Sequence, residues 1–260
     1  MLINLIMIKI TRLLMLLWIA LCLNACKKDS TPAEPAQKTY LLKSITVDGH
    51  VDESFEYDSK GLIKTWSLDN FEYSFTYDAE DRLKEVKLYE LSKSASTCKW
   101  VYSYSSNKIL LTKYYDYQDT HSVSKQTFEL TGNKITKAFF DEDASYYYSY
   151  KYDNAWNIIL TKSVDEKNHS STEDKITYDD KKGAFSMMKG YNIFFFLGSL
   201  APKAGYTNNI IEKAVVGQEV YEHTTYQYNA DGFPISGTTN YRDFDGSHYD
   251  VKFTYDYIIK

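Results

Sequence analysis

The sequence predicts an all-β fold, a curved antiparallel meander of about 14 to 16 strands built from repeated β-hairpins. Tyrosine supplies 25 of the 260 residues, and aromatic side chains favour the half-buried surface of a pleated sheet. A short strand phrase recurs along the chain, and residues typical of tight turns follow most copies. Because so long a sheet should curl, we expect it to close partly on itself or to be capped by an irregular apolar segment.

The N-terminal residues differ in character from the rest of the chain. Lys9 and Arg12 precede an uncharged apolar run from Leu13 to Leu23, which is the pattern of an export signal. The run is about half the roughly 20 residues that a membrane-spanning helix needs. We therefore interpret residues 1–25 as a cleaved signal peptide.

The end of this leader, Leu23 to Cys26, resembles a bacterial lipobox, in which a small residue such as Ala25 precedes the acylated cysteine. The resemblance implies that Cys26 becomes the lipidated N-terminus, with palmitate-type acyl chains, whereas Cys22 follows the bulky Leu21 and fits the pattern less well. Residues 26–39 are polar and proline-containing, as in an extended tether. Their charged start, Lys27 to Asp29, is similar to that of Bacteroidetes lipoproteins, some of which reach the cell surface. We expect a lipid-anchored outer-membrane protein on the periplasmic or cell-surface face.

The charge of the chain limits the classes of partner that we expect, and its cysteine content limits the disulfides. The chain carries a formal net charge of −5, and beyond the leader its arginines are Arg82 and Arg242. Nucleic acid is not an expected partner, because phosphate and base recognition rely on clustered Lys and Arg. Cys98 is the one cysteine after Cys26, so no internal disulfide is expected.

The repeated phrase has the form aromatic, polar, Tyr, Asp, and residues 40–260 contain eight copies of it. This alternation predicts a strand with one buried face. The Asp or Asn that follows favours a turn, and a later Gly or Asn tolerates positive φ, so each unit predicts a β-hairpin. Tyr77 should be among the costliest positions to truncate. The copies begin at Phe55, Phe75, Tyr102, Phe128, Tyr150, Ile176, Tyr226 and Phe253.

This phrase resembles the YD repeat of RHS-type proteins, Tyr-Asp-x-x-Gly-x-Leu, and more closely the YD-like repeats of Bacteroidetes lipoproteins of unknown function. The resemblance covers residues 40–260. Several copies depart from the pattern, since Ser105 and Thr131 replace the Asp, and Asp81 and Trp156 stand near the expected Gly. The resemblance implies a strand pattern and assigns no activity.

The interval from Tyr178 to Tyr228 is about twice the others, which suggests a skipped copy and an insertion at about 184–211. This segment contains Phe194, Phe195 and Phe196 and is the most apolar of the mature chain. We expect it to interrupt the hairpin series and to have little strand of its own. It would either fold across the sheet to cover an apolar face or form the wall of a ligand pocket.

Few residues suggest chemistry, and we predict no catalytic residue, metal or cofactor. Cys98 lies beside Trp100 in an apolar strand, where a buried inert thiol is more typical than a nucleophile. The five histidines lack metal-ligand spacing. Two acidic segments, Asp141 to Asp143 and Asp243 to Gly246, have oxygen ligands for calcium, although an Asp-Gly turn explains the second equally well. The candidate ligand-binding residues, each also compatible with a core role, are Trp66, Trp100, Trp156, Phe194 and Phe196.

These observations favour a membrane-anchored binding or scaffold module for a glycan or a protein. The alternative is a carboxylate-dependent glycan hydrolase, because Asp and Glu occur on many turns. A pocket with two carboxylates about 5 to 10 Å apart would favour the enzyme.

Overall fold

The computed structural model describes residues 38–260, apart from 93–95, 118–119, 141–143, 190–206 and 244. The predicted signal peptide, Cys26, Phe194 and Phe196 therefore lie outside the described residues. Residues Thr39–Lys260 form one compact unit. In the described part of the chain, no helix is long and apolar enough to cross a membrane.

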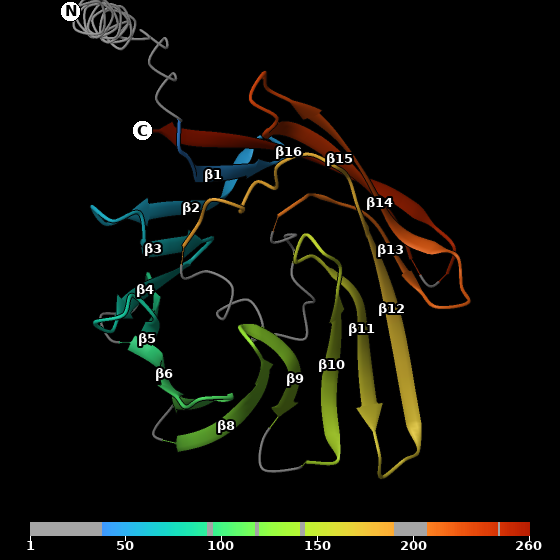
Figure 1. Ribbon diagram of the computed structural model, residues 1–260. Coiled ribbons are helices and arrows are strands. Elements are labelled where there is room, and N and C mark those ends of the chain that lie inside the picture. Colours follow the sequence, from blue (N-terminus) through green and yellow to red (C-terminus); the bar gives the residue numbers. More distant parts are fainter. Residues whose placement is uncertain (1–37, 93–95, 118–119, 141–143, 190–206, 244) are drawn as a thin grey trace, which may run out of the picture. The chain divides into compact units, whose positions relative to one another are not determined.

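The unit is an antiparallel β-barrel in which each strand pairs with its neighbours in sequence. The described residues form sixteen strands (Figure 1). The first eight are β1 (Tyr40–Val47), β2 (His50–Tyr57), β3 (Ile63–Leu68), β4 (Phe71–Tyr77), β5 (Leu83–Glu90), β6 (Ser96–Tyr104), β7 (Lys108–Tyr117) and β8 (Thr120–Thr131). The others are β9 (Lys134–Phe140), β10 (Tyr146–Tyr152), β11 (Ile158–Asp165), β12 (Ser170–Tyr178), β13 (Ile210–Val215), β14 (Val220–Tyr228), β15 (Pro234–Arg242) and β16 (His248–Ile259).

The predicted all-β meander of hairpins is confirmed, but its closure is complete rather than partial. Strand β1 pairs with β16 from Tyr40 opposite Ile259 to Val47 opposite Phe253. In Figure 1 these first and last strands lie side by side. Closure removes both edges of the sheet, whose unpaired N–H and C=O groups would otherwise face solvent.

The repeated phrase lies on the even-numbered strands and points its aromatic residues into the barrel. Phe55 and Phe75 are 4% and 7% exposed and belong to one core cluster. In five copies the tyrosine that follows packs against that cluster and donates its hydroxyl to a backbone carbonyl of the preceding hairpin. Tyr226, the first aromatic of its copy, and Tyr257, two residues beyond its copy, donate the same kind of hydrogen bond. We call these contacts tyrosine staples. They join Tyr57 to Leu42, Tyr77 to Ile63, Tyr104 to Leu83, Tyr152 to Ile135, Tyr178 to Ile158, Tyr226 to Ile210 and Tyr257 to Pro234.

The turns after the phrase define one end of the barrel, which we call the repeat rim. At the first of them, Asp58 Oδ1 accepts hydrogen bonds from the backbone N–H groups of Lys60 and Leu62, at 2.8 and 2.9 Å. Gly61 has a φ of 81°. Asp81 and Trp156 take the same left-handed conformation, with φ of 60° and 73°. The turn geometry therefore persists where the preferred glycine is absent.

Among the described residues, the long interval does not break the strand ladder. Strand β12 pairs directly with β13, from Asp174 opposite Val215 to Tyr178 opposite Ile210. The next copy of the phrase lies on β14, the next even-numbered strand. The long interval is thus an enlarged connection at the repeat rim, and the backbone ladder continues past it.

The described start of this connection packs inside the barrel. Ala184, Phe185 and Met188 are buried in the core cluster, and the Phe185 ring meets that of Phe55 edge-on at 6.2 Å. Lys189 forms a parallel bridge with Leu62, on the far side of the barrel from β12 (Figure 1). The segment from 184 to 189 therefore covers apolar surface.

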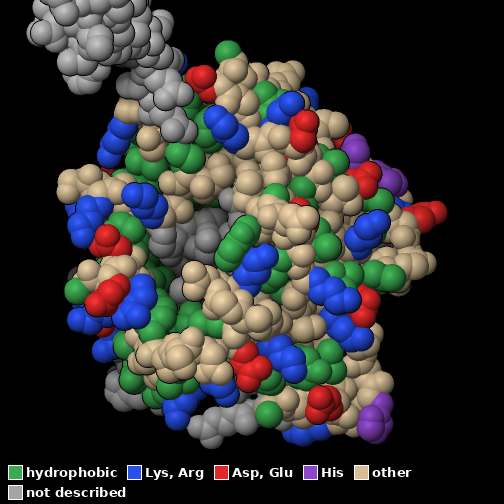
Figure 2. Space-filling view, in the orientation of Figure 1, with side chains coloured by type: hydrophobic (Ala, Val, Ile, Leu, Met, Phe, Trp, Pro, Cys, Tyr) green, Lys and Arg blue, Asp and Glu red, His purple; other side chains and the backbone are tan. Residues whose placement is uncertain are grey.

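The surface carries many charged side chains, with apolar ones between them (Figure 2). Lys108 alternates with the buried Ile109 and faces outward opposite Glu129, and Lys162 lies opposite Glu173 with a 2.9 Å ion pair. A Lys or Arg facing lipid at the membrane midplane costs about 2–4 kcal/mol. The outer wall is therefore suited to water rather than to lipid. Further outward-facing charged residues are Lys64, Glu72, Glu85, Lys87, Lys99, Lys125, Lys137, Lys151 and Lys175.

Candidate ligand-binding pocket

Strands β12 to β16 form an open pocket of about 750 Å³ near the rim opposite the repeat turns. The pocket lies on the inner wall, because Asp174 is two positions from the buried Ile176 and Tyr241 is two positions from the buried Thr239. Its lining consists of Asp174, Val215, Gln218, Glu219, Tyr221, Tyr241, Arg242, Asp243 and Tyr249.

Aromatic rings form one side of this pocket. Tyr241 and Tyr249 are directly opposite each other on β15 and β16, and their rings stack at 5.2 Å between centroids and 23° between planes. Tyr249 is 53% exposed, so its ring is accessible. Such rings offer a flat apolar face and a hydroxyl at one end, which suits a ligand with both apolar and polar groups.

Charged groups converge on the same space. Burial raises the pKa of Asp174, with smaller opposing effects from Lys213 and from a hydrogen bond with Tyr221. Arg242 pairs with Glu219 at the rim. The pocket thus places a partly desolvated carboxylate among tyrosine side chains.

A nearly buried ion pair supports the wall beside the pocket. Lys213 and Glu222 are opposite each other on β13 and β14, with Nζ 2.9 Å from Oε2 and side chains 11% and 14% exposed. Glu222 in turn lies opposite Tyr241. Each of these two charges compensates the other, since an unpaired charge at this depth would be costly.

A second hollow, of about 800 Å³, lies over Gly237 among short Thr and Ser side chains of β14, β15, β16 and β1. Lys252 and Asp48 are the charged residues of its lining. The inner pocket is the stronger candidate, because it combines a stacked aromatic pair with several charged groups.

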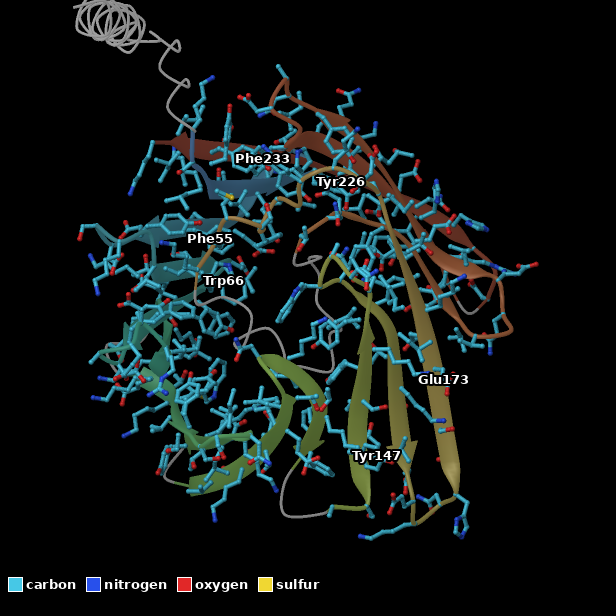
Figure 3. The ribbon with its side chains drawn as sticks, in the orientation of Figure 1. Phe55, Trp66, Tyr147, Glu173, Tyr226 and Phe233 are labelled. Carbon is cyan, nitrogen blue, oxygen red and sulfur yellow. The ribbon has the colours of Figure 1, made fainter. Side chains whose placement is uncertain are left out.

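Two of the three candidate tryptophans pack against the core. The Trp66 ring stacks with Phe55 and Tyr73, and its Nε1 donates to Glu53 Oε2 at 3.0 Å (Figure 3). Trp100, on β6, packs against the same cluster. Neither lines the pocket.

Trp156 lies apart from the pocket, at the repeat rim. It is 47% exposed, and Lys134 Nζ is 4.4 Å from the centroid of its ring. An accessible ring is compatible with ligand stacking, and Trp156 is the one aromatic residue of its turn, Asn154 to Asn157.

The remaining candidates are Cys98, the two acidic segments, Phe194 and Phe196. Cys98 is half-buried on β6 and forms no disulfide with a described residue. Asp243 begins a hairpin turn in which its backbone N–H donates to Ser247 O at 2.8 Å, and Asp141 to Asp143 lie outside the described residues. Among the described residues, no group of three or more His, Cys, Asp or Glu side chains is arranged to hold a metal ion.

Apart from Asp243, which the sequence suggested as a calcium ligand, sequence reasoning missed the pocket residues because they do not belong to the repeated phrase. Tyr221, Tyr241 and Tyr249 are tyrosines that the phrase does not require, and Arg242 is one of two arginines beyond the leader. Tyrosine and arginine residues outside the repeated phrase were the sequence feature from which the pocket could have been inferred. Asp174 gave no such indication, because it reaches Tyr221 on β14 only through the pairing of β12 with β13 and of β13 with β14.

In comparisons with known proteins, no family model matches the chain, and no curated protein matches it either. Among solved structures, the barrel is similar to a porin-like protein from Bacteroides uniformis ATCC 8492, with 12% identity, a TM-score of 0.41 and coverage of 85% of this chain and 99% of that one. A porin-like protein from Bacteroides vulgatus ATCC 8482 is similar at 15% identity and a TM-score of 0.40, over 84% and 99% of the two chains. These likenesses are too distant to assign a function.

Proposed function

We propose that this chain is an exported, lipid-tethered barrel that binds a small polar ligand, such as part of a glycan, in the inner pocket of β12 to β16. The observation that carries the proposal is the stacked pair Tyr241 and Tyr249 beside Asp174 and the Arg242–Glu219 pair. Ligand pockets typically combine apolar or aromatic walls with a few convergent polar groups.

The tether belongs to the proposal because the leader ends at Cys26 and the outer wall is charged. A barrel with such a wall fits a protein held in water by acyl chains at the outer membrane, on either face. Two or more acyl chains make anchoring of this kind stable. Cys26→Ala should therefore give an unprocessed or soluble product, while Cys22→Ala should change little. Membrane-bound, normally processed Cys26→Ala protein would refute the tether.

The ligand pocket is tested with the processed lipoprotein in detergent and a panel of oligosaccharides. Tyr249→Ala should weaken binding by about tenfold, since loss of an aromatic stacking contact costs roughly 1–3 kcal/mol in comparable sites. Tyr147→Ala is the matched control, because Tyr147 is also in a tyrosine-rich strand but faces outward beside Phe139. Equal affinities for both variants and the unmodified protein would remove the pocket as the binding site.

A glycan hydrolase is the second candidate, favoured by the raised pKa of Asp174 and by the presence of Glu219 and Asp243 in the same pocket. A protonated carboxyl beside an ionised one is the arrangement of a general acid and its partner. Release of reducing ends from the bound oligosaccharide distinguishes the two functions. Turnover that Asp174→Asn abolishes would replace the binding proposal with the enzyme, whereas binding without turnover supports the module.

A further inference from the structure

The charges around the pocket leave Asp174 without an ion pair among the described residues, although Lys213 lies near enough to lower its pKa. Arg242 pairs with Glu219, and Lys213 pairs with Glu222. In the described part of the chain, no cation is in ion-pair contact with Asp174, whose hydrogen-bond partner is the neutral Tyr221. A partly desolvated carboxylate in this position is stabilised by a positive charge brought by a ligand.

The aromatic side of the pocket has the same preference. The faces of tyrosine rings carry negative electrostatic potential, so they attract a cation held within about 6 Å of the ring centroid. The pocket contains the stacked pair Tyr241 and Tyr249 and, beside Asp174, Tyr221. An ammonium group between the ring faces and Asp174 would meet both kinds of attraction.

We propose that the ligand of this pocket is cationic, a sugar that bears a free amine. The inference rests on the proposed glycan-binding function and specifies its ligand. The amine lies against Asp174, and the apolar face of the sugar ring lies against Tyr249. An acidic sugar fits less well, because Arg242 is already paired with Glu219.

Matched probes isolate the charge of the ligand. In mildly acidic buffer, short oligomers of glucosamine carry an ammonium group on each ring, and the corresponding oligomers of N-acetylglucosamine keep the nitrogen without its charge. Calorimetry with the processed lipoprotein should show about tenfold tighter binding of the glucosamine oligomer, within the usual range of a cation–π contact supported by a carboxylate. The preference should shrink as salt is added, because the pocket is open to solvent.

Asp174→Asn tests the residue that carries the inference. This variant should bind both oligomers with similar affinity and should keep its melting temperature, since asparagine retains a hydrogen-bond acceptor for Tyr221. Tyr249→Phe should keep the preference, because phenylalanine also attracts a cation through its ring face. Retention of the full charge preference in folded Asp174→Asn would overturn the assignment of Asp174.

The outcomes separate this inference from the proposed function. Equal binding of the two oligomers by the unmodified protein would overturn the cationic ligand and leave the glycan pocket in place. Tighter binding of an oligogalacturonate than of either probe would also overturn it, by showing an anion site at Arg242. Failure of every oligosaccharide in the panel to bind would refute the proposed function itself.

Discussion

At the scale of single residues, the tyrosine of five of the eight phrases combines core packing with a hydrogen bond to the backbone. Tyr77 packs its ring against the core cluster and donates its hydroxyl to Ile63 O at 2.9 Å. The sequence predicted the buried ring from alternation alone. It gave no indication of the hydroxyl's partner, because the acceptor belongs to the neighbouring hairpin.

Truncation of Tyr77 should therefore be costly. We expect Tyr77→Ala to lower the free energy of unfolding by about 3 kcal/mol, the lower end for large aromatic truncations in cores. Tyr77→Phe, which loses only the hydrogen bond, should cost about 1 kcal/mol. Urea denaturation measures both, with the outward-facing Thr76→Ala as control. A loss below about 0.5 kcal/mol for Tyr77→Ala would place the ring in solvent.

Trp156 lies in a turn, where we expect its side chain to lower the stability of the barrel, in contrast to the side chain of Tyr77. Its φ of 73° is left-handed, a conformation that is strained for a bulky side chain and free of strain for glycine. Trp156→Gly should stabilise the barrel by up to about 1 kcal/mol, offset by loss of the contact with Lys134. Gly61→Ala, at a φ of 81° where the added Cβ would lie in ordinary contact with Leu41 Cδ1 at 3.8 Å, should instead destabilise it by about 1 kcal/mol through backbone strain. If Trp156→Gly instead destabilised the barrel by more than about 1 kcal/mol, the contact of Trp156 with Lys134 would contribute more stability than the backbone strain costs.

At the scale of elements, the β12–β13 connection is much longer than the hairpin turns that the structure describes. Its sequence predicted either a cover for an apolar face or the wall of a ligand pocket, and in its described part Phe185 and Met188 are buried in the core cluster. Polar groups fix its ends: Asn157 Nδ2 donates to Asn208 Oδ1 at 2.9 Å, and the Asn209 backbone N–H donates to Asp179 Oδ1 at 3.0 Å. These hydrogen bonds hold the start of the connection, at Asp179, and its end, at Asn208 and Asn209.

Loss of the Phe185 ring should test whether this cover stabilises the barrel. Phe185→Ala should cost about 3 kcal/mol, because it opens a cavity beside Phe55 in the core. Thermal unfolding monitored by circular dichroism gives the change, and Lys181→Ala, an exposed position of the same connection, serves as the control. A melting temperature that falls no further for Phe185→Ala than for Lys181→Ala would show that the segment does not cover the core.

At the scale of the whole molecule, the tyrosine staples form a belt around the barrel that depends on neutral phenols. Burial raises the pKa of the stapling tyrosines, among them Tyr57, Tyr77 and Tyr226, above the ordinary value. In the unfolded chain a tyrosine titrates near pH 10. Since the folded pKa is higher, the stability from the neutral form is complete below about pH 10 and is lost as pH rises through the folded values.

Alkaline conditions should therefore unfold the barrel cooperatively. We expect urea midpoints to fall steadily above about pH 10, with the tyrosinate absorbance of the buried staples appearing together with unfolding, after that of exposed tyrosines such as Tyr249. Tyr77→Phe should show a shallower fall, because one titrating group is absent. Ionisation of all tyrosines at pH 10 in a barrel that stays folded would contradict the burial of the staples.

The sequence by itself determined the strand pattern, the inward phase and the turns. These properties are local, because alternation sets which face is buried and an Asp such as Asp58 bonds within its own turn. Tertiary structure alone decided that β1 closes on β16, that β12 pairs with β13 across a long connection, and that Asp174 meets Tyr221, Tyr241 and Tyr249. Closure and the pocket depend on the register between strands that are distant in sequence, and a repeated phrase with the same local pattern in every copy does not encode which of its strands meet.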